Sequence, residues 1–198
     1  MFSETEIAVI NNNKEVQEVV NELKLKFLAK EAEFFEIETH DFLALIFLST
    51  AVGKAMANNH ISFAEEMSLQ KKARKLSKGG FFLSKDPVAD GMKYLIKSFD
   101  SWEEVFYKAV HDIFLILFKE ETIEAANNPT YKFEQRITYA PYLLVRFLTC
   151  LFLETDDDVL EPGRIRKIEF DKLKDIGNKT GFSELRIFTE FLDRFEVK

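Results

Sequence analysis

Residues 40–56, HDFLALIFLSTAVGKAM, are apolar on nearly every side when they are placed on a helix. A helix of this kind has no polar face for solvent and is typical of a protein core. The stretch therefore predicts a central buried helix. The chain also has only 7 Gly and 4 Pro in 198 residues, which leaves little turn chemistry for a many-stranded sheet.

Signals for further helices recur along the chain. Residues 14–30 place valine, leucine and phenylalanine on one face, opposite lysine and glutamate. Further helix starts are marked by capping residues, or by a cap followed by proline, at Ser62–Glu65, Asp86-Pro87, Ser101–Glu104 and Asn128-Pro129. Pro141 must kink or restart the helix that it meets. We expect an all-α multi-helix bundle of about seven or eight helices.

One break in composition divides the chain. The polar stretch ETDDDVLEPGR covers residues 154–164, and residues 164–198 after it carry nine Lys and Arg against seven Asp and Glu. That segment is therefore mildly basic, whereas the whole chain has a net charge of −7. We expect one helical domain over residues 1–198, with residues 164–198 as a candidate helical-hairpin subdomain.

Residues 170–195 include two short amphipathic runs joined by a turn around Gly181. Within them, IGNKTGFSELRIF resembles the second helix-turn-helix of AraC-type regulators, where an Ile-Ala, Gly-Phe-Ser and Phe pattern recurs. Ser183 can cap the second helix. The resemblance implies a DNA-associated transcriptional regulator, with Ser183, Arg186 and Thr189 as the residues that would contact DNA.

The charges of the same helix favour another interpretation. Its exposed positions also include Glu184, Glu190 and Asp193, and carboxylates beside a phosphate backbone are repulsive. A helical hairpin that packs on the bundle is the competing interpretation, and it is the one that we favour. The net charge of −7 likewise disfavours indiscriminate nucleic-acid binding.

Three lysines of the stretch QKKARKLSK, residues 70–78, share one helix face because they follow one another at intervals of four and three. One interpretation is a solvated last turn, whose cations favour the negative end of the helix dipole. The other is a docking patch for an acidic partner or a phosphate backbone. The residues that this second interpretation assigns to partner binding are Lys71, Lys75, Lys78, Arg164, Arg166 and Lys167.

Phenylalanine is unusually frequent, with 21 residues in 198. Phe34-Phe35 and Phe81-Phe82 are adjacent pairs, and neighbours on a helix cannot both face the same core, so one member of each pair should make a second contact or be partly exposed. Aromatic side chains are enriched in interface cores. We therefore assign Phe81 and Phe82, beside the Gly79-Gly80 turn, to partner binding; the alternatives are a core built from phenylalanine and a Phe-lined pocket for an apolar ligand.

Residues with catalytic or metal-binding potential are scattered. His40, His60 and His111 lie in separate segments without a Glu-x-x-His arrangement. Cys150 lies within the apolar run YLLVRFLTCLFL, as is usual for a small buried hydrophobe. The sequence therefore predicts no catalytic residue, no metal site and no cofactor, and the protein is not expected to be an enzyme.

The start of the chain lacks the pattern of a signal peptide, and its apolar runs are too short to span a bilayer. A single cysteine fits a reduced, cytoplasmic compartment. We expect a cytoplasmic, non-catalytic helical protein that acts through protein–protein association, as an adaptor, an inhibitor or a small subunit of a larger assembly. Its partner is another protein or a second copy, and no membrane is involved.

Overall fold

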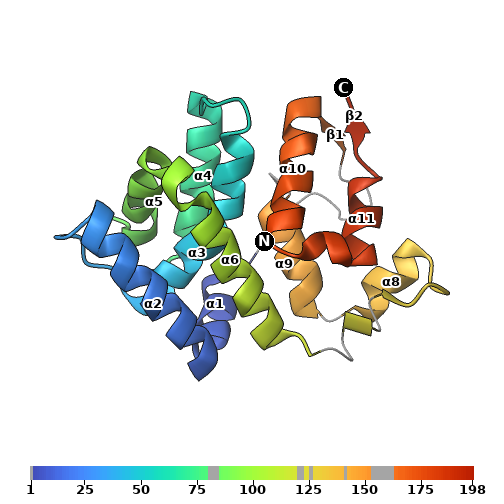
Figure 1. Ribbon diagram of the computed structural model, residues 1–198, viewed down its shortest axis with the longest axis horizontal. Helices are drawn as coiled ribbons and strands as arrows, with labels where there is room; N and C mark the ends of the chain where they lie inside the picture. The colour runs from blue at the N-terminus through green and yellow to red at the C-terminus, as the bar shows by residue number, and fades with distance from the viewer. Residues whose placement is uncertain (1, 80–84, 120–122, 125–126, 141, 153–162) are drawn as a thin grey trace.

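The computed structural model describes residues 2–79, 85–119, 123–124, 127–140, 142–152 and 163–198 (Figure 1). This part of the chain contains ten α-helices, a short 3-10 helix and one pair of two-residue strands, so the predicted all-α bundle is confirmed. The helices are α1 (Glu4–Asn11), α2 (Lys14–Glu31), α3 (Thr39–Ala55), α4 (Phe63–Leu76), α5 (Pro87–Lys97), α6 (Phe99–Leu117), α8 (Phe133–Tyr139), α9 (Tyr142–Phe152), α10 (Lys167–Lys179), η1 (Phe182–Glu184) and α11 (Arg186–Leu192).

The central helix is α3. Fifteen of its 17 residues are buried, and α1, α2, α4, α5, α6, α9 and α10 all pack on it. The prediction from residues 40–56 is therefore confirmed. Among the described residues, no helix combines the length and the apolar character needed to cross a membrane.

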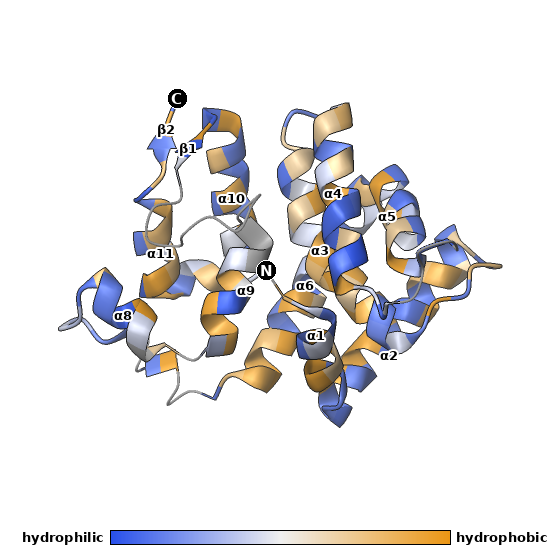
Figure 2. Ribbon diagram, turned by 180° about the vertical axis from the view of Figure 1, so that it is seen from behind, coloured by the Kyte–Doolittle hydropathy of each residue, from blue (hydrophilic) through white to orange (hydrophobic). Residues whose placement is uncertain are grey.

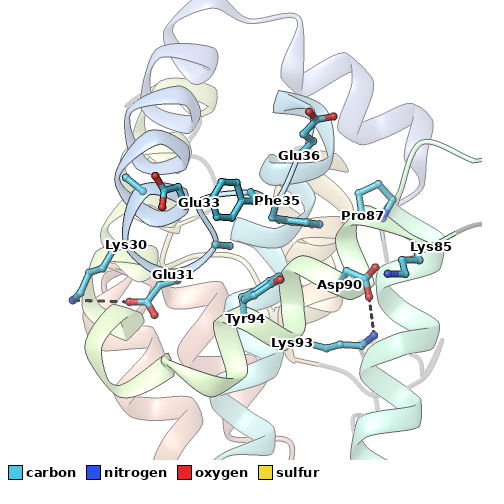
Figure 3. A pocket seen from close by; sticks show the side chains of 13 residues that line it. Lys30, Glu31, Glu33, Phe35, Glu36, Lys85, Pro87, Asp90, Lys93 and Tyr94 are labelled. Atoms are coloured by element: carbon cyan, nitrogen blue, oxygen red, sulfur yellow. Dashed lines mark hydrogen bonds and ion pairs between the residues drawn. The ribbon is translucent and has the colours of Figure 1, made fainter.

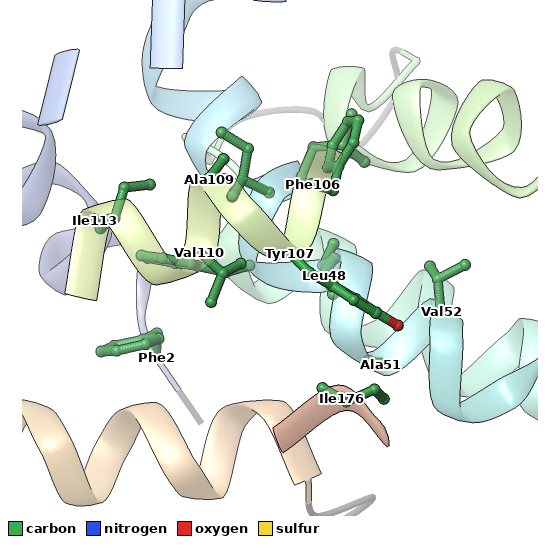
Figure 4. Packing of buried hydrophobic residues seen from close by; sticks show 14 of the residues in the cluster. Phe2, Leu48, Ala51, Val52, Phe106, Tyr107, Ala109, Val110, Ile113 and Ile176 are labelled. Atoms are coloured by element: carbon green, nitrogen blue, oxygen red, sulfur yellow. The ribbon is translucent and has the colours of Figure 1, made fainter. Parts of the chain in front are cut away.

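Aromatic rings fill much of the core around α3. Phe27 of α2 meets Trp102 and Phe106 of α6 edge-on, with ring centroids 5.1 and 5.3 Å apart. Tyr107 of α6 extends between α3 and Ile176 of α10 (Figure 4). The core therefore continues from the α1–α6 half of the bundle into the C-terminal helices, and phenylalanine supplies 13 of the 47 buried hydrophobic residues described in it, more than any other residue type.

Two predicted helix starts are wrong. Helix α6 begins at Phe99, before Ser101, because burial of the Phe99 ring, 6.2 Å from the Tyr107 ring, outweighs the capping potential of the serine. Asn128 starts a turn in place of a helix: its side chain accepts a hydrogen bond from the Thr130 amide (3.0 Å), and α8 begins only at Phe133.

Other local predictions are confirmed. Ser62 and Glu65 form a capping box at the start of α4, and Asp86 caps α5 with Pro87 at its first turn. The helix before Pro141 ends at Tyr139 and the next begins at Tyr142. An additional helix, α1, starts from a capping box between Ser3 and Glu6.

The C-terminal residues form two helices that differ from the predicted pair. Gly181 turns the chain with a φ of +77°, as expected, but the next residues form η1, and α11 begins only at Arg186. Ser183 lies inside η1 and caps neither helix, because the chain uses that turn to bury Phe182. Strand β1 (Arg164–Ile165) pairs in parallel with β2 (Glu196–Val197) and joins the two ends of this segment.

Candidate protein-binding surfaces

Helix α4 exposes one face along its whole length. At about 100° per residue, the exposed side chains at positions 63, 67, 71, 74 and 75 fall within an arc of about 120°. The small exposed Ala64 lies in the same arc, the exposed Glu66 lies about 60° outside it, and Leu69, Ala73 and Leu76 are buried. Position 78, just past the end of the helix, continues the same arc and is also exposed. We call these residues the α4 face: Phe63, Met67, Lys71, Arg74, Lys75 and Lys78.

The α4 face is apolar at its first end and cationic at the other. Phe63 is 78% exposed and Met67 is 50% exposed, and every later member is a lysine or an arginine. Residues 63–78 hold five Lys and Arg and two Glu, a net charge of +3 in a chain of −7. The second half of α4 is strongly hydrophilic in Figure 2. The predicted cations therefore lie beside two exposed apolar side chains that the sequence analysis did not single out.

Surface ion pairs hold part of this face. Lys78 donates a hydrogen bond to Glu38 at 3.0 Å, and both side chains are well exposed. That bond raises the pKa of Lys78. Lys75 also has an interaction partner, while Lys71 and Arg74 are exposed. Exposed pairs contribute little to stability, so a partner's carboxylates can replace them at low cost.

Arg166 connects the first turn of α10 to the first turn of α4. Its guanidinium lies 3.3 Å from Glu65 and 2.8 Å from Glu169. The hydrogen bond from Arg166 lowers the pKa of Glu169; burial would raise the pKa of Glu65, but Ser62 and the charge of Arg166 lower it overall. Both helices begin near the top of Figure 1. The sequence-predicted Arg166 therefore lies near the apolar end of the α4 face.

The other two predicted cations of this segment flank Arg166. Arg164 pairs with Glu196 across the two strands at 2.6 Å, and Lys167 pairs with Asp171 one turn along α10 at 2.7 Å. All four of these side chains are more than half exposed. The structure therefore places Arg164 and Lys167 at the start of α10, near the apolar end of the α4 face and away from Lys75 and Lys78 at its other end.

The structure describes only one of the two adjacent phenylalanine pairs. Phe81 and Phe82 lie outside the described residues. In the other pair, Phe34 is 95% exposed, while the Phe35 ring packs on Tyr94 with centroids 5.4 Å apart. One member of this pair is thus exposed, as predicted, although the pair lies in the turn after α2 and not on a helix. Both line an open groove of about 810 Å³ between the end of α2, the following loop and α5 (Figure 3).

The DNA-contact candidates surround the start of α11. Arg186 donates to Glu190 at 3.0 Å, and its backbone N–H donates to Asn127 at 2.8 Å. Thr189 donates its hydroxyl to the Arg186 carbonyl at 3.0 Å, and Ser183 is only partly exposed. Helix α11 has seven residues, and α8 packs against it.

The histidines lie apart in the fold. His40 is buried, with Nδ1 3.0 Å from Asp41 Oδ1, whereas His60 is exposed and His111 lies beside Gly181. Within the described ranges, no group of three or more His, Cys, Asp or Glu side chains is close enough to hold a metal ion.

The fold and these surfaces define an all-helical bundle that presents a mixed apolar and cationic helix face and, separately, an aromatic groove. Comparisons of the chain with models of protein families, with curated proteins and with solved structures find no match. The resemblance of residues 176–188 to the helix-turn-helix of AraC-type regulators therefore rests on those residues alone.

Proposed function

We propose that this protein is non-catalytic and acts by binding an acidic partner protein through the α4 face, as an adaptor, an inhibitor or a small subunit of an assembly. One observation carries the proposal: two exposed apolar side chains, Phe63 and Met67, continue directly into a line of exposed cations on one helix face. With its single cysteine, the protein is proposed to work in the cytoplasm.

The chemistry of the face favours a protein partner. Aromatic side chains, methionine and arginine are enriched at interface cores, and Phe63, Met67 and Arg74 supply one of each. The lysines beyond them suit the rim, where charges guide encounter and orientation more than they add affinity. A phosphate backbone would use the cations but would leave the two apolar side chains in water.

The α4 face alone is smaller than a usual protein–protein interface. The 14 residues of α4 span about 21 Å at 1.5 Å per residue, and a helix is about 10–12 Å wide. One face of α4 therefore covers far less than the roughly 800 Å² that each partner of a stable complex usually buries. The adjoining start of α10 supplies more surface: Lys167 is exposed, and Ile168 is 46% exposed. A partner that covered both helix starts would contact the predicted cations of α10 as well.

The test compares charge reversal on the α4 face with the same reversal elsewhere. The tagged protein, the variant Lys71→Glu/Lys75→Glu and the control Lys97→Glu/Lys119→Glu are purified gently from the native host, each with and without nuclease. Lys97 and Lys119 are exposed and lie outside the α4 face. An acidic protein should co-purify with the wild type and the control, and its affinity for the α4 variant should fall at least about tenfold.

The affinity of the purified pair should also weaken between about 50 and 300 mM salt, because exposed charges are screened. Two outcomes oppose the proposal. If the same partners bind both variants equally, the lysines are only a solvated helix end. If nucleic acid co-purifies and the proteins disappear on nuclease treatment, the helix-turn-helix alternative at residues 170–195 takes its place.

A further inference from the structure

We infer that the groove between residues 31–36 and α5, which is lined by none of the α4-face residues, is a second binding site for an extended protein segment in which arginine or lysine alternates with apolar residues. Its floor is aromatic, the unpaired charges on its loop side are those of Glu33 and Glu36, and the loop beside it has a backbone suited to an extended ligand.

The aromatic part of the groove is anchored at its base and exposed at its lip. Phe35 packs against the hydrophobic core and on Tyr94, so these rings form a fixed floor. Phe34 stands at the lip with 95% of its surface exposed. A phenylalanine this exposed gains by being covered, since burial of a large apolar side chain is favourable.

Several charges around the groove are already held by neighbours. Lys93 pairs with Asp90 at 2.7 Å. Glu31 accepts a hydrogen bond from Trp102 Nε1 at 2.7 Å and lies 3.9 Å from Lys30. These pairs line the side of the groove formed by α5 and the end of α2 (Figure 3), and they leave little charge there for a ligand.

Glu33 and Glu36 differ from those acids. They bracket Phe34 and Phe35 in the sequence, both are exposed, and within the described residues neither has an ion-pair partner. Lys85 also lines the groove, beside Pro87 and Asp90 in Figure 3 and away from Glu33. The lining holds four acidic and three basic residues, a net charge of −1. A cationic ligand side chain is therefore favoured on the loop side.

Arginine suits this combination better than other cations. Its planar guanidinium stacks on an aromatic face and binds a carboxylate with two hydrogen bonds. Phe34 offers the exposed ring, and Glu33 and Glu36 offer the carboxylates on either side. Successive side chains of an extended chain point to opposite sides, so the arginine side chains would lie toward Glu33 and Glu36 while the alternating apolar side chains lie toward the floor formed by Phe35 and Tyr94.

The backbone of the loop favours an extended segment over a compact small molecule. Residues 35–38 are non-helical, and the described backbone hydrogen bonds of this segment are those from Phe35 N–H to Ala32 O (2.9 Å) and from Phe42 N–H to Glu38 O (2.9 Å). Glu36 is an exposed residue that makes no backbone–backbone hydrogen bond within the described residues, so its N–H and C=O are available for main-chain hydrogen bonds, the mode by which many domains hold extended peptides.

The test uses four fluorescein-labelled ten-residue peptides on the intact protein, read by fluorescence anisotropy. Their alternating pairs are leucine–arginine, leucine–glutamate, leucine–serine and serine–arginine. The leucine–arginine peptide should bind most tightly, at least about tenfold more tightly than the leucine–glutamate peptide. Phe34→Ser should remove most of this binding, and Glu33→Lys/Glu36→Lys should reverse the charge preference.

Phe63→Ser is the matched control, because it removes another highly exposed phenylalanine, 78% exposed, from the α4 face and leaves the net charge unchanged. It should bind the leucine–arginine peptide like the wild type. The inference is overturned if the four peptides bind the Lys71→Glu/Lys75→Glu variant equally, because that variant lacks the cations of the α4 face that could hold the leucine–glutamate peptide. It is also overturned if no peptide binds, or if Phe63→Ser and Phe34→Ser have the same effect. The two sites are tested independently. The acidic partner reports on the α4 face through the Lys71→Glu/Lys75→Glu variant, and the leucine–arginine peptide reports on the groove through Phe34→Ser, so one site can fail while the other holds.

Discussion

Replacing Gly53 by alanine tests how closely α3 and α6 pack at the centre of the bundle. A Cβ atom at position 53 would lie 1.9 Å from the Tyr107 hydroxyl oxygen, and 3.2 Å from Cζ of Tyr107 and from Cζ of Phe99. The hydroxyl is buried and has no hydrogen-bond partner within the described residues. Burial raises the pKa of Tyr107 above its ordinary range, and the negative charge of nearby Glu103 raises it further.

These distances give the sign and the size of the effect. Overpacking a core costs about 1–3 kcal/mol, while alanine is favoured over glycine in a helix by about 1 kcal/mol. A Cβ only 1.9 Å from an oxygen belongs at the upper end of that overpacking range, so Gly53→Ala alone should destabilise the protein by about 2 kcal/mol. Tyr107→Phe removes the atom at 1.9 Å and an unsatisfied polar group, so it should be neutral or stabilising by up to about 1 kcal/mol.

The double variant makes the prediction specific. Without the hydroxyl, the Cβ has only the two contacts at 3.2 Å, so Gly53→Ala should be neutral or favourable in the Tyr107→Phe background. The coupling energy between the two substitutions should be about 2 kcal/mol, where each kcal/mol shifts Tm by about 2–4 °C in a domain of this size.

Urea unfolding followed by the fluorescence of Trp102, the single tryptophan, and by helical circular dichroism measures all four proteins. Gly79→Ala is the control, because nothing lies within 4 Å of its Cβ position, and it should change the stability by less than about 0.5 kcal/mol. If Gly53→Ala lowered the stability equally in the wild type and in Tyr107→Phe, the close approach of position 53 to the Tyr107 hydroxyl would be refuted. A loss of more than about 1 kcal/mol in Tyr107→Phe would show that the hydroxyl has a hydrogen-bond partner.

The remaining predictions concern the ion pair between α8 and α11. The Arg136 side chain is fully buried and donates to Glu190 at 2.9 Å and to the Asn128 and Tyr131 carbonyls, so Arg136→Met should destabilise the protein by about 3 kcal/mol. Arg186 is the more exposed partner of the same Glu190, and Arg186→Met should cost less than about 1 kcal/mol. Equal losses of stability in urea unfolding would contradict this prediction. Burial would raise the pKa of Glu190, but the hydrogen bonds and charges of its two arginines lower it overall. Its folded pKa therefore lies below the unfolded value, and the stability it contributes is present above about pH 4.5 and lost as the pH falls through the folded pKa. The stability difference between wild type and Glu190→Gln should shrink from pH 7 to pH 3 in urea titrations. A constant difference would contradict a pKa of Glu190 lowered by its two arginines.

Local patterns predicted much of the fold. The apolar stretch at residues 40–56 became the buried helix α3, and the capping box at Ser62 started α4 where expected, because each signal depends on residues within one or two helical turns. The same applies to the face shared by Lys71, Lys75 and Lys78. Phe63 and Met67 precede Lys71 at intervals of four, so the whole α4 face was readable from the spacing of the sequence.

Capping signals were less reliable where a large side chain competed with them. Ser101 lies inside α6 because the core takes up Phe99, and Ser183 lies in η1 because the turn buries Phe182. A cap contributes about 1 kcal/mol, whereas a fully buried aromatic ring contributes more. The difference depends on which core the ring can reach, and that is a property of the folded molecule.

By itself, the sequence determined that this chain is a helical bundle with α3 at its centre, and it fixed the positions of the exposed cations, because helical periodicity is a short-range property. Only the tertiary structure decided which charges meet and which aromatic rings remain exposed. Arg166 and Glu65 pair across 101 residues, and Arg136 and Glu190 across 54. Such pairs depend on how whole helices are placed against one another, and the same placement leaves Phe34 in solvent beside a groove while Phe35 joins the core.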